Sequence, residues 1–95
     1  MIRPLRLALQ VIAYIGRLVP EPRRAVKLAL KELRAERGDI RTLEGPLAGY
    51  NRLRVGRHRI IFAYAEDGAI EAVFIEDRSL VYDVFEAEFI KKLRR

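Results

Sequence analysis

The sequence predicts an α+β fold in which two N-terminal helices pack on a small antiparallel sheet of about four strands, and a short helix ends the chain. Three observations predict it: an amphipathic helical pattern in the first half, evenly spaced strand-like segments in the second, and turn residues between them. The 95 residues, 51% of them hydrophobic, suffice for one modest core. We therefore expect residues 1–95 to form a single domain.

The first eighteen residues fit a short strand followed by a short helix. Residues 5–9, Leu-Arg-Leu-Ala-Leu, alternate leucine with arginine or alanine, which suits a short strand, and Pro4 places its start at a sheet edge. Residues 10–18 then place Val11, Ile12 and Ile15 at helical spacing, so we expect these three to face the core. A single long helix over residues 3–18 is an open alternative, because the apolar residues satisfy both periods.

The second helix has the clearest signals in the chain. Pro20-Glu-Pro22 places proline in the first turn, where it sacrifices no internal hydrogen bond, and Glu21 complements the helix dipole. The apolar repeat at helical spacing consists of Val26, Ala29, Leu30 and Leu33. Gly38 is the expected stop.

The second half predicts a loop and then a meander of strands. Residues 39–48 are expected to form the loop, with Leu43 as a buried anchor. Strands are expected at residues 50–55, 59–64 and 69–76, with Gly56 and Glu66-Asp67-Gly68 at the turns. A further short strand at Val81-Tyr82 and a C-terminal helix at residues 86–95 complete the prediction.

Composition excludes several classes of site. There is no cysteine, so disulfides and thiolate metal sites are excluded, and a cytoplasmic location is the simplest expectation. His58 is the only histidine, which leaves little for a zinc site or a Ser-His-Asp triad, and we expect it to be a solvent-facing turn residue. The apolar stretch at residues 7–16 is too short to span a bilayer, so no membrane partner is expected.

The charge is high and unevenly distributed. The net charge is +6 and the pI is about 10.2, which suggests an anionic partner. Residues 49–62 contain four arginines and no acid, whereas residues 63–90 carry seven net negative charges. Because strand side chains alternate between faces, Arg52 and Arg54 should share one face while Leu53 and Val55 share the other. Arginine forks match phosphate bidentately, so this face suits a polyanion.

Several short motifs together resemble the RelE/ParE superfamily, the toxins of bacterial toxin–antitoxin pairs. In order they are Leu43-Glu-Gly45, Gly49-Tyr50, Arg52-Leu-Arg54-Val-Gly56, Arg59-Ile-Ile-Phe-Ala-Tyr64, Asp77-Arg78 and Val81-Tyr82. The resemblance covers residues 20–82, about two thirds of the chain. It implies helices packed on a small antiparallel sheet, which agrees with the fold predicted from periodicity.

The resemblance also implies a site and an activity. RelE-like members resemble ribosome-dependent endoribonucleases that cut messenger RNA. By that likeness Arg59 and Arg78 would stabilise the phosphate, Tyr82 would be the general base, and Arg52 and Arg54 would help neutralise the scissile phosphate. Arg57 belongs to the same basic segment and is included as a substrate-binding candidate. Neither a cofactor nor a metal is implied.

Two other functions stay open. ParE-like members poison DNA gyrase and lack the nuclease residues, and a general RNA-binding module without catalysis would also explain the arginines. In either toxin reading the partner is a cognate antitoxin, whose acidic segment would cover the basic face in a hetero-oligomer. The ribosome and mRNA, or alternatively DNA gyrase, would be the target.

Overall fold

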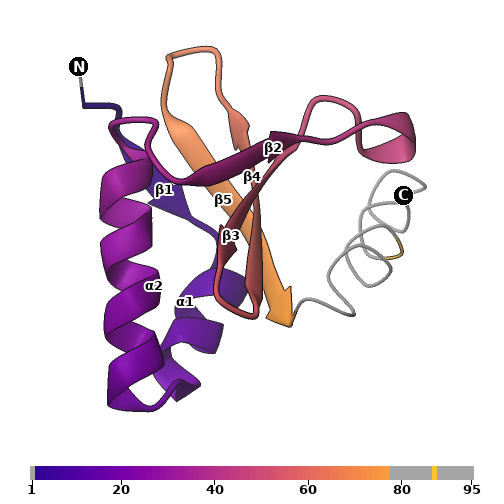
Figure 1. The fold of residues 1–95 in the computed structure, drawn as a ribbon. Coiled ribbons are helices and arrows are strands. Elements are labelled where there is room, and N and C mark those ends of the chain that lie inside the picture. The colour runs from indigo at the N-terminus through magenta and orange to yellow at the C-terminus, as the bar shows by residue number, and fades with distance from the viewer. Residues whose placement is uncertain (1, 78–86, 88–95) are drawn as a thin grey trace.

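The computed structural model describes residues 2–77 and residue 87. These residues form two α-helices on one face of a five-stranded sheet with the strand order β1-β5-β4-β3-β2 (Figure 1). The elements are β1 (Leu5–Leu7), α1 (Leu9–Arg17), α2 (Pro20–Leu33), β2 (Asp39–Thr42), β3 (Asn51–Val55), β4 (His58–Tyr64) and β5 (Ile70–Asp77). The predicted fold class is therefore confirmed, whereas the predicted strand at Val81-Tyr82 and the helix at 86–95 lie outside the described residues.

The sheet differs from the prediction in strand number and in direction. It has five strands, because residues 39–42, expected in a loop, form β2 on the edge of the sheet. This segment contains one apolar residue, Ile40, which lies opposite Leu53, so its pattern was too weak to identify as a strand. The sheet is also mixed, because β1 pairs parallel with β5 while the other pairs are antiparallel.

The N-terminal segment is a strand followed by a helix, and the long-helix alternative is wrong. The backbone amide of Ala8 donates to Ala72 O at 2.9 Å, which continues the ladder of β1 until α1 begins at Leu9. Val11 and Ile15 are buried as expected. Ile12 is 52% exposed, so the expectation that it faces the core is wrong.

Helix α2 confirms the clearest sequence signal. Val26, Leu30 and Leu33 are buried along one face, at the predicted spacing. The helix ends at Leu33 and the chain then turns, with Glu36 at a φ of 58° and Gly38 at a φ of 134°. These two residues with positive φ redirect the chain into β2. The helix therefore ends before Gly38, the residue predicted to stop it.

The core divides into two parts, one on each face of the sheet. The larger part, between sheet and helices, consists of Val11, Ile15, Val26, Leu30, Leu33, Leu53, Ile60, Phe62, Ile70, Ala72 and Ile75. On the other face Leu47, Ile61 and Phe74 form a smaller cluster. Because Leu53 belongs to the helix side, its neighbours Arg52 and Arg54 lie on the face away from the helices, as the alternation predicted. Among the described residues, no helix is long and apolar enough to cross a membrane.

Candidate nucleic-acid interface

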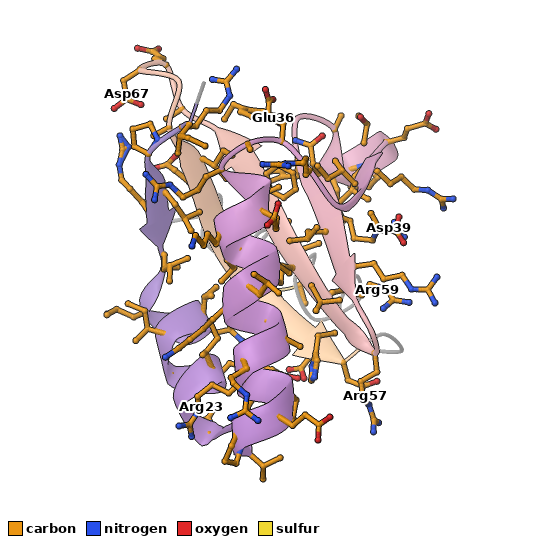
Figure 2. The ribbon with its side chains drawn as sticks, turned by 60° about the vertical axis from the view of Figure 1, so that its left-hand side comes forward. Arg23, Glu36, Asp39, Arg57, Arg59 and Asp67 are labelled. Carbon is orange, nitrogen blue, oxygen red and sulfur yellow. The ribbon has the colours of Figure 1, made fainter. Side chains whose placement is uncertain are left out.

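Four arginines lie on the sheet face away from the helices. The register places Arg41 of β2 directly opposite Arg52 of β3, and Arg54 of β3 directly opposite Arg59 of β4. Side chains directly opposite on antiparallel strands share a face, with Cβ atoms about 4.5–5.5 Å apart, and like charges in such pairs are destabilising. We call Arg41, Arg52, Arg54 and Arg59 the arginine face. Figure 2 shows Arg59 pointing away from α2.

Two acids flank this face at one level of the sheet. Asp39 lies opposite Arg54 and Glu76 lies opposite Arg59, so the row across four strands is acid, arginine, arginine, acid. Asp39 is shared, because its Oδ1 accepts a hydrogen bond from Arg52 Nη2 at 2.8 Å while its Oδ2 lies 4.0 Å from Arg54 Nε. The two central arginines are thus adjacent, and each has an acid on its outer side.

Arg52 and Arg54 differ in accessibility. The Arg52 side chain is 10% exposed, and its Nε is buried without a hydrogen-bond partner among the described residues. The Arg54 side chain is 54% exposed. Of the two residues predicted to help neutralise the scissile phosphate, Arg54 is the one that reaches solvent, whereas Arg52 is held by Asp39.

Arg57 and Arg59 are both tied to the β3–β4 turn. Arg59 Nη1 donates to Gly56 O at 2.9 Å, which lays the guanidinium along the turn. Arg57 is in the turn itself, and its Nε donates to Asp77 Oδ2 at 2.6 Å. The Arg57 side chain is 73% exposed, so this ion pair is solvated and lies at the end of β5.

His58 and the described tyrosines are not poised as bases on the arginine face. His58 is in β4, half-buried on the helix side, and its Nδ1 lies 2.9 Å from the Tyr14 hydroxyl, so the expectation of a solvent-facing turn residue is wrong. Burial, the largest effect, lowers the pKa of His58. Burial likewise raises the pKa of Tyr14, Tyr50 and Tyr64, which keeps their hydroxyls protonated at neutral pH.

The structure therefore brings together part of the predicted site. Arg52, Arg54 and Arg59 share one face, and Arg57 adjoins it at the turn. Arg78 and Tyr82 lie outside the described residues. Sequence reasoning missed Arg41, because its place opposite Arg52 depends on β2, which was expected to be a loop.

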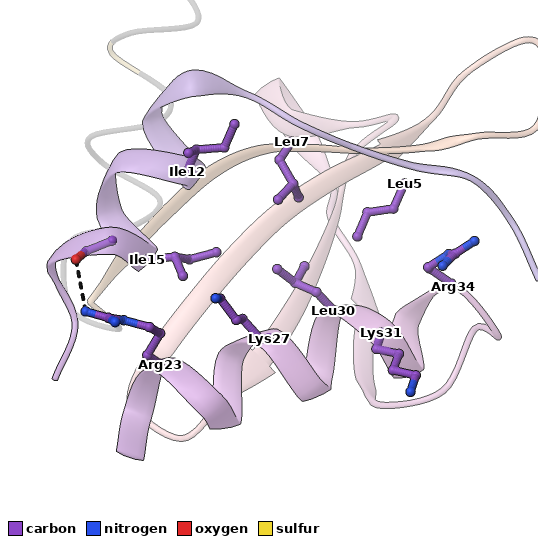
Figure 3. Close-up of a pocket in the computed structure, with 10 residues that line it drawn as sticks. Leu5, Leu7, Ile12, Ile15, Arg23, Lys27, Leu30, Lys31 and Arg34 are labelled. Atoms are coloured by element: carbon purple, nitrogen blue, oxygen red, sulfur yellow. Dashed lines mark hydrogen bonds between the residues drawn. The ribbon is translucent and has the colours of Figure 1, made fainter. Parts of the chain in front are cut away.

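A second basic surface lies on the helix side of the molecule. There a groove of about 520 Å³ runs between β1, α1 and α2 (Figure 3). Its lining residues are Leu5, Leu7, Ile12, Ile15, Gly16, Arg23, Lys27, Leu30, Lys31 and Arg34. We call it the helix-side groove. Arg23 is held by Gly16 O and Leu18 O, and Arg34 by Arg3 O, whereas Lys27 and Lys31 are exposed and make no ion pair within the described residues.

Comparison with solved structures identifies the fold. The chain superposes on the RelE–RelB complex from Pyrococcus horikoshii OT3 with a TM-score of 0.68 and 23% identity, over 82% of this chain and 97% of that one. The toxin–antitoxin complex RelBE2 from Mycobacterium tuberculosis gives a TM-score of 0.70 and 21% identity, over 82% and 100%. The chain has a RelE-like fold.

The structural likeness extends to a third complex, whereas sequence identity stays low. YoeB–YefM from Staphylococcus aureus matches with a TM-score of 0.62 and 16% identity, over 78% of this chain and 94% of that chain. No protein-family profile and no curated protein sequence matches this chain. The RelE-like fold is thus shared at low sequence identity.

Proposed function

We propose that this chain is the toxin of a toxin–antitoxin pair and that it cleaves messenger RNA on the ribosome, in the cytoplasm. Its RelE-like fold supports the toxin role, because two of the similar solved structures are toxin–antitoxin complexes. The arginine face supports a nucleic-acid target. The action on the ribosome follows from the sequence resemblance to RelE-like members.

One observation carries the proposal: Arg54 and Arg59 lie directly opposite each other on the sheet face away from α1 and α2. A like-charge cross-strand pair is unfavourable in the free protein, and Asp39 and Glu76 on its outer sides offset part of the repulsion. A phosphate between the two guanidiniums would remove the remaining repulsion and accept charge-assisted hydrogen bonds from both. An RNA backbone is therefore the ligand for which this arrangement is suited.

The chemistry needs three events at the scissile phosphate. The 2′-hydroxyl loses its proton and its oxygen attacks the phosphorus. The 5′-oxygen then leaves with a proton, giving a 2′,3′-cyclic phosphate and a 5′-hydroxyl. Charge develops on the phosphate oxygens in the transition state, where Arg59 and Arg78 would stabilise it. Arg54 and Arg57 would hold the flanking phosphates, and Arg52, through Asp39, would help to order this face.

Tyr82 is the proposed general base. A tyrosine with a pKa near 10 is a weak base at neutral pH, and neighbouring guanidiniums favour the phenolate. The three described tyrosines have raised pKa values, which disfavours each of them in this role. The role of Tyr82 itself is what the resemblance to RelE-like members implies.

The test is induced expression of wild type, Tyr82→Phe and Tyr64→Phe in bacteria, with mapping of new messenger RNA 5′ ends. Loss of a general base slows cleavage by about 10²–10⁴-fold. We expect growth arrest with in-frame cleavage in the wild type, and loss of both in Tyr82→Phe. Tyr64→Phe makes the same chemical change on the helix side, where the hydroxyl bonds Glu36, and should cleave normally.

Two outcomes would contradict this function. Growth arrest without cleavage, unchanged by Tyr82→Phe and accompanied by DNA-damage signalling, would favour the gyrase-directed alternative. RNA binding that weakens with salt, without arrest or cleavage, would leave an RNA-binding module.

The helix-side groove is the proposed docking site for the antitoxin. Its apolar floor would receive apolar side chains, and Lys27 and Lys31 on its rim would attract carboxylates, so an acidic amphipathic segment fits it. Such a segment would dock on the side opposite the arginine face. A second acidic stretch of the antitoxin would be needed to cover that face in the hetero-oligomer.

This docking can be tested with the acidic antitoxin that we propose is encoded beside the gene. Lys27→Glu should weaken its binding at least tenfold, because the new carboxylate repels the acidic segment. Arg24→Glu changes the same charge on α2 outside the groove and should bind within twofold of wild type. Equal effects of the two substitutions would show that only net charge matters.

A further inference from the structure

Helix α1 contacts the end of β5 through a side chain that imitates a peptide group. Gln10 Nε2 donates to Ile75 O at 2.7 Å, and the Ile75 amide donates to Gln10 Oε1 at 2.9 Å. Both polar backbone groups of Ile75 are therefore engaged by one carboxamide.

This pairing continues the β1–β5 ladder where β1 has ended. The backbone pairing of the two strands runs from Leu5 opposite Ile70 to Leu7 opposite Ala72, and Ala8 adds a last hydrogen bond to Ala72 O. The chain then turns into α1, which leaves Ile75 without a backbone partner from β1. Buried peptide groups need partners, and Gln10 supplies both.

A second contact from the same helix reaches the next residues of β5 indirectly. Tyr14 lies one turn after Gln10, and its hydroxyl bonds His58 Nδ1 at 2.9 Å, with the two rings edge to face. His58 lies directly opposite Asp77, the last residue of β5. Asp77 in turn accepts the hydrogen bond from Arg57. The strand end is thus held from α1 and from the β3–β4 turn.

We propose that Gln10 and Tyr14 are positioning residues that fix residues 75–77 as the origin of the catalytic segment. This inference rests on the proposed function, because Arg78 and Tyr82 follow Asp77 in the sequence. A displacement of about 1 Å at the origin of a reacting group can reduce the rate about 10²-fold. The brace, which we define as the contacts of Gln10 with Ile75 and of Tyr14 with His58, would therefore affect turnover without touching RNA.

The test compares Gln10→Met with Leu9→Met in the full-length protein. Methionine keeps the length of glutamine but removes the amide, while Leu9 is the adjacent residue and is 84% exposed. Two quantities are measured: the hydrogen-exchange rate of the Ile75 amide, and kcat and KM for ribosome-dependent cleavage. For Gln10→Met we expect exchange at least tenfold faster and kcat at least tenfold lower, with KM within twofold. Leu9→Met should match wild type.

Tyr14→Phe serves as the second variant, so that the test survives if Gln10→Met fails to fold. It removes one hydroxyl and should lower kcat at least threefold while leaving Ile75 exchange within threefold of wild type.

Each contrary result overturns the proposal. Unchanged Ile75 exchange in Gln10→Met would show that the carboxamide does not hold the strand. Faster exchange with unchanged kcat, or a raised KM at constant kcat, would show that it holds the strand without positioning the reaction. If the wild type itself cleaves no RNA, the proposed function fails and with it the positioning role, while the exchange rates still decide whether the brace holds β5.

Discussion

At the scale of single residues, Asp39 and Arg52 form an asymmetric ion pair. The Arg52 side chain is 10% exposed, whereas that of Asp39 is 56% exposed. Removing the exposed partner leaves a buried charge without its acceptor, so Asp39→Ala should lower the free energy of unfolding by about 1–3 kcal/mol. Arg52→Met removes the buried charge and fills similar volume, so it should change stability by less than about 1 kcal/mol.

Urea unfolding of the two variants measures this asymmetry. Glu44→Ala is the control, because Glu44 is an exposed acid near the end of β2 and makes no ion pair within the described residues, so it should lie within about 0.5 kcal/mol of wild type. Equal destabilisation by Asp39→Ala and Arg52→Met would mean that the pair acts as an ordinary surface salt bridge.

The lowered pKa of His58 should make the stability of the protein depend on pH. Burial and the nearby Arg57 and Arg59 lower the pKa of His58, and this outweighs Asp77, which raises it. Because the folded pKa lies below the usual value of about 6.5, the unfolded chain binds the proton more tightly. The stability due to the neutral ring is present above about pH 6.5 and is lost as the pH falls through the folded pKa.

Thermal unfolding between pH 5.5 and 8 checks this prediction. Wild type should lose stability toward pH 5.5 more steeply than His58→Gln, whose side chain does not titrate. The difference between the two curves removes the contribution of the carboxylates that both proteins share. A difference that is flat with pH would contradict the lowered pKa.

The sequence predicted which face Arg52 and Arg54 lie on, but not what surrounds them. Period-two alternation places Arg52 and Arg54 together, because strand geometry alone decides it. The burial of Arg52 depends on β2, which contributes Asp39. Gln10 was read only as a helix residue, since its role requires the end of β1 to lie beside Ile75. Local patterns therefore predict orientation, whereas partners come from tertiary contacts.

At the scale of elements, substitutions at two glycines can test how backbone conformation and packing set the ends of α1 and α2. Gly38 joins α2 to β2 with a φ of 134°, and a Cβ built there would lie 2.8 Å from Leu53 Cδ1. Gly38→Ala should therefore lower the free energy of unfolding by more than about 1 kcal/mol. Gly16, near the end of α1, has nothing within 4 Å of a built Cβ. Gly16→Ala should stabilise by about 0.4–1 kcal/mol.

Chemical denaturation of both variants gives opposite signs if these boundaries are correct. Both variants replace glycine with alanine, so they differ only in the backbone conformation and the surroundings of the substituted residue. Destabilisation by Gly16→Ala would indicate that α1 packs more tightly there than the structure shows, and an unaffected Gly38→Ala would indicate that the α2–β2 link can relax.

Helix α2 and strands β3 to β5 were predictable because each has a strong local pattern. Two features of the sheet were not. The segment that forms β2 has one apolar residue and is a strand only because β3 offers a partner. The parallel pairing of β1 with β5 joins segments more than sixty residues apart, and no local period encodes it.

At the scale of the whole molecule, the positive charge is divided between two surfaces. The arginine face lies on one side of the sheet, and the helix-side groove lies on the other. At physiological ionic strength the Debye length is about 8 Å, so charges on surfaces separated by the sheet and helices act nearly independently. The protein should therefore present one site to nucleic acid and a separate one to its antitoxin.

A crossed experiment tests this separation. Arg54→Gln with Arg59→Gln should weaken binding of a single-stranded RNA and reduce the slope of log affinity against log salt by roughly 1.4, since each lost phosphate contact contributes about 0.7. The same pair should leave binding of the antitoxin segment that docks in the helix-side groove within about threefold of wild type. Lys27→Glu with Lys31→Glu should show the reverse, with antitoxin binding weakened at least tenfold and the salt slope for RNA nearly unchanged. If both pairs weakened both ligands equally, binding would depend on the net charge of the protein, because a loss confined to one ligand requires two distinct surfaces.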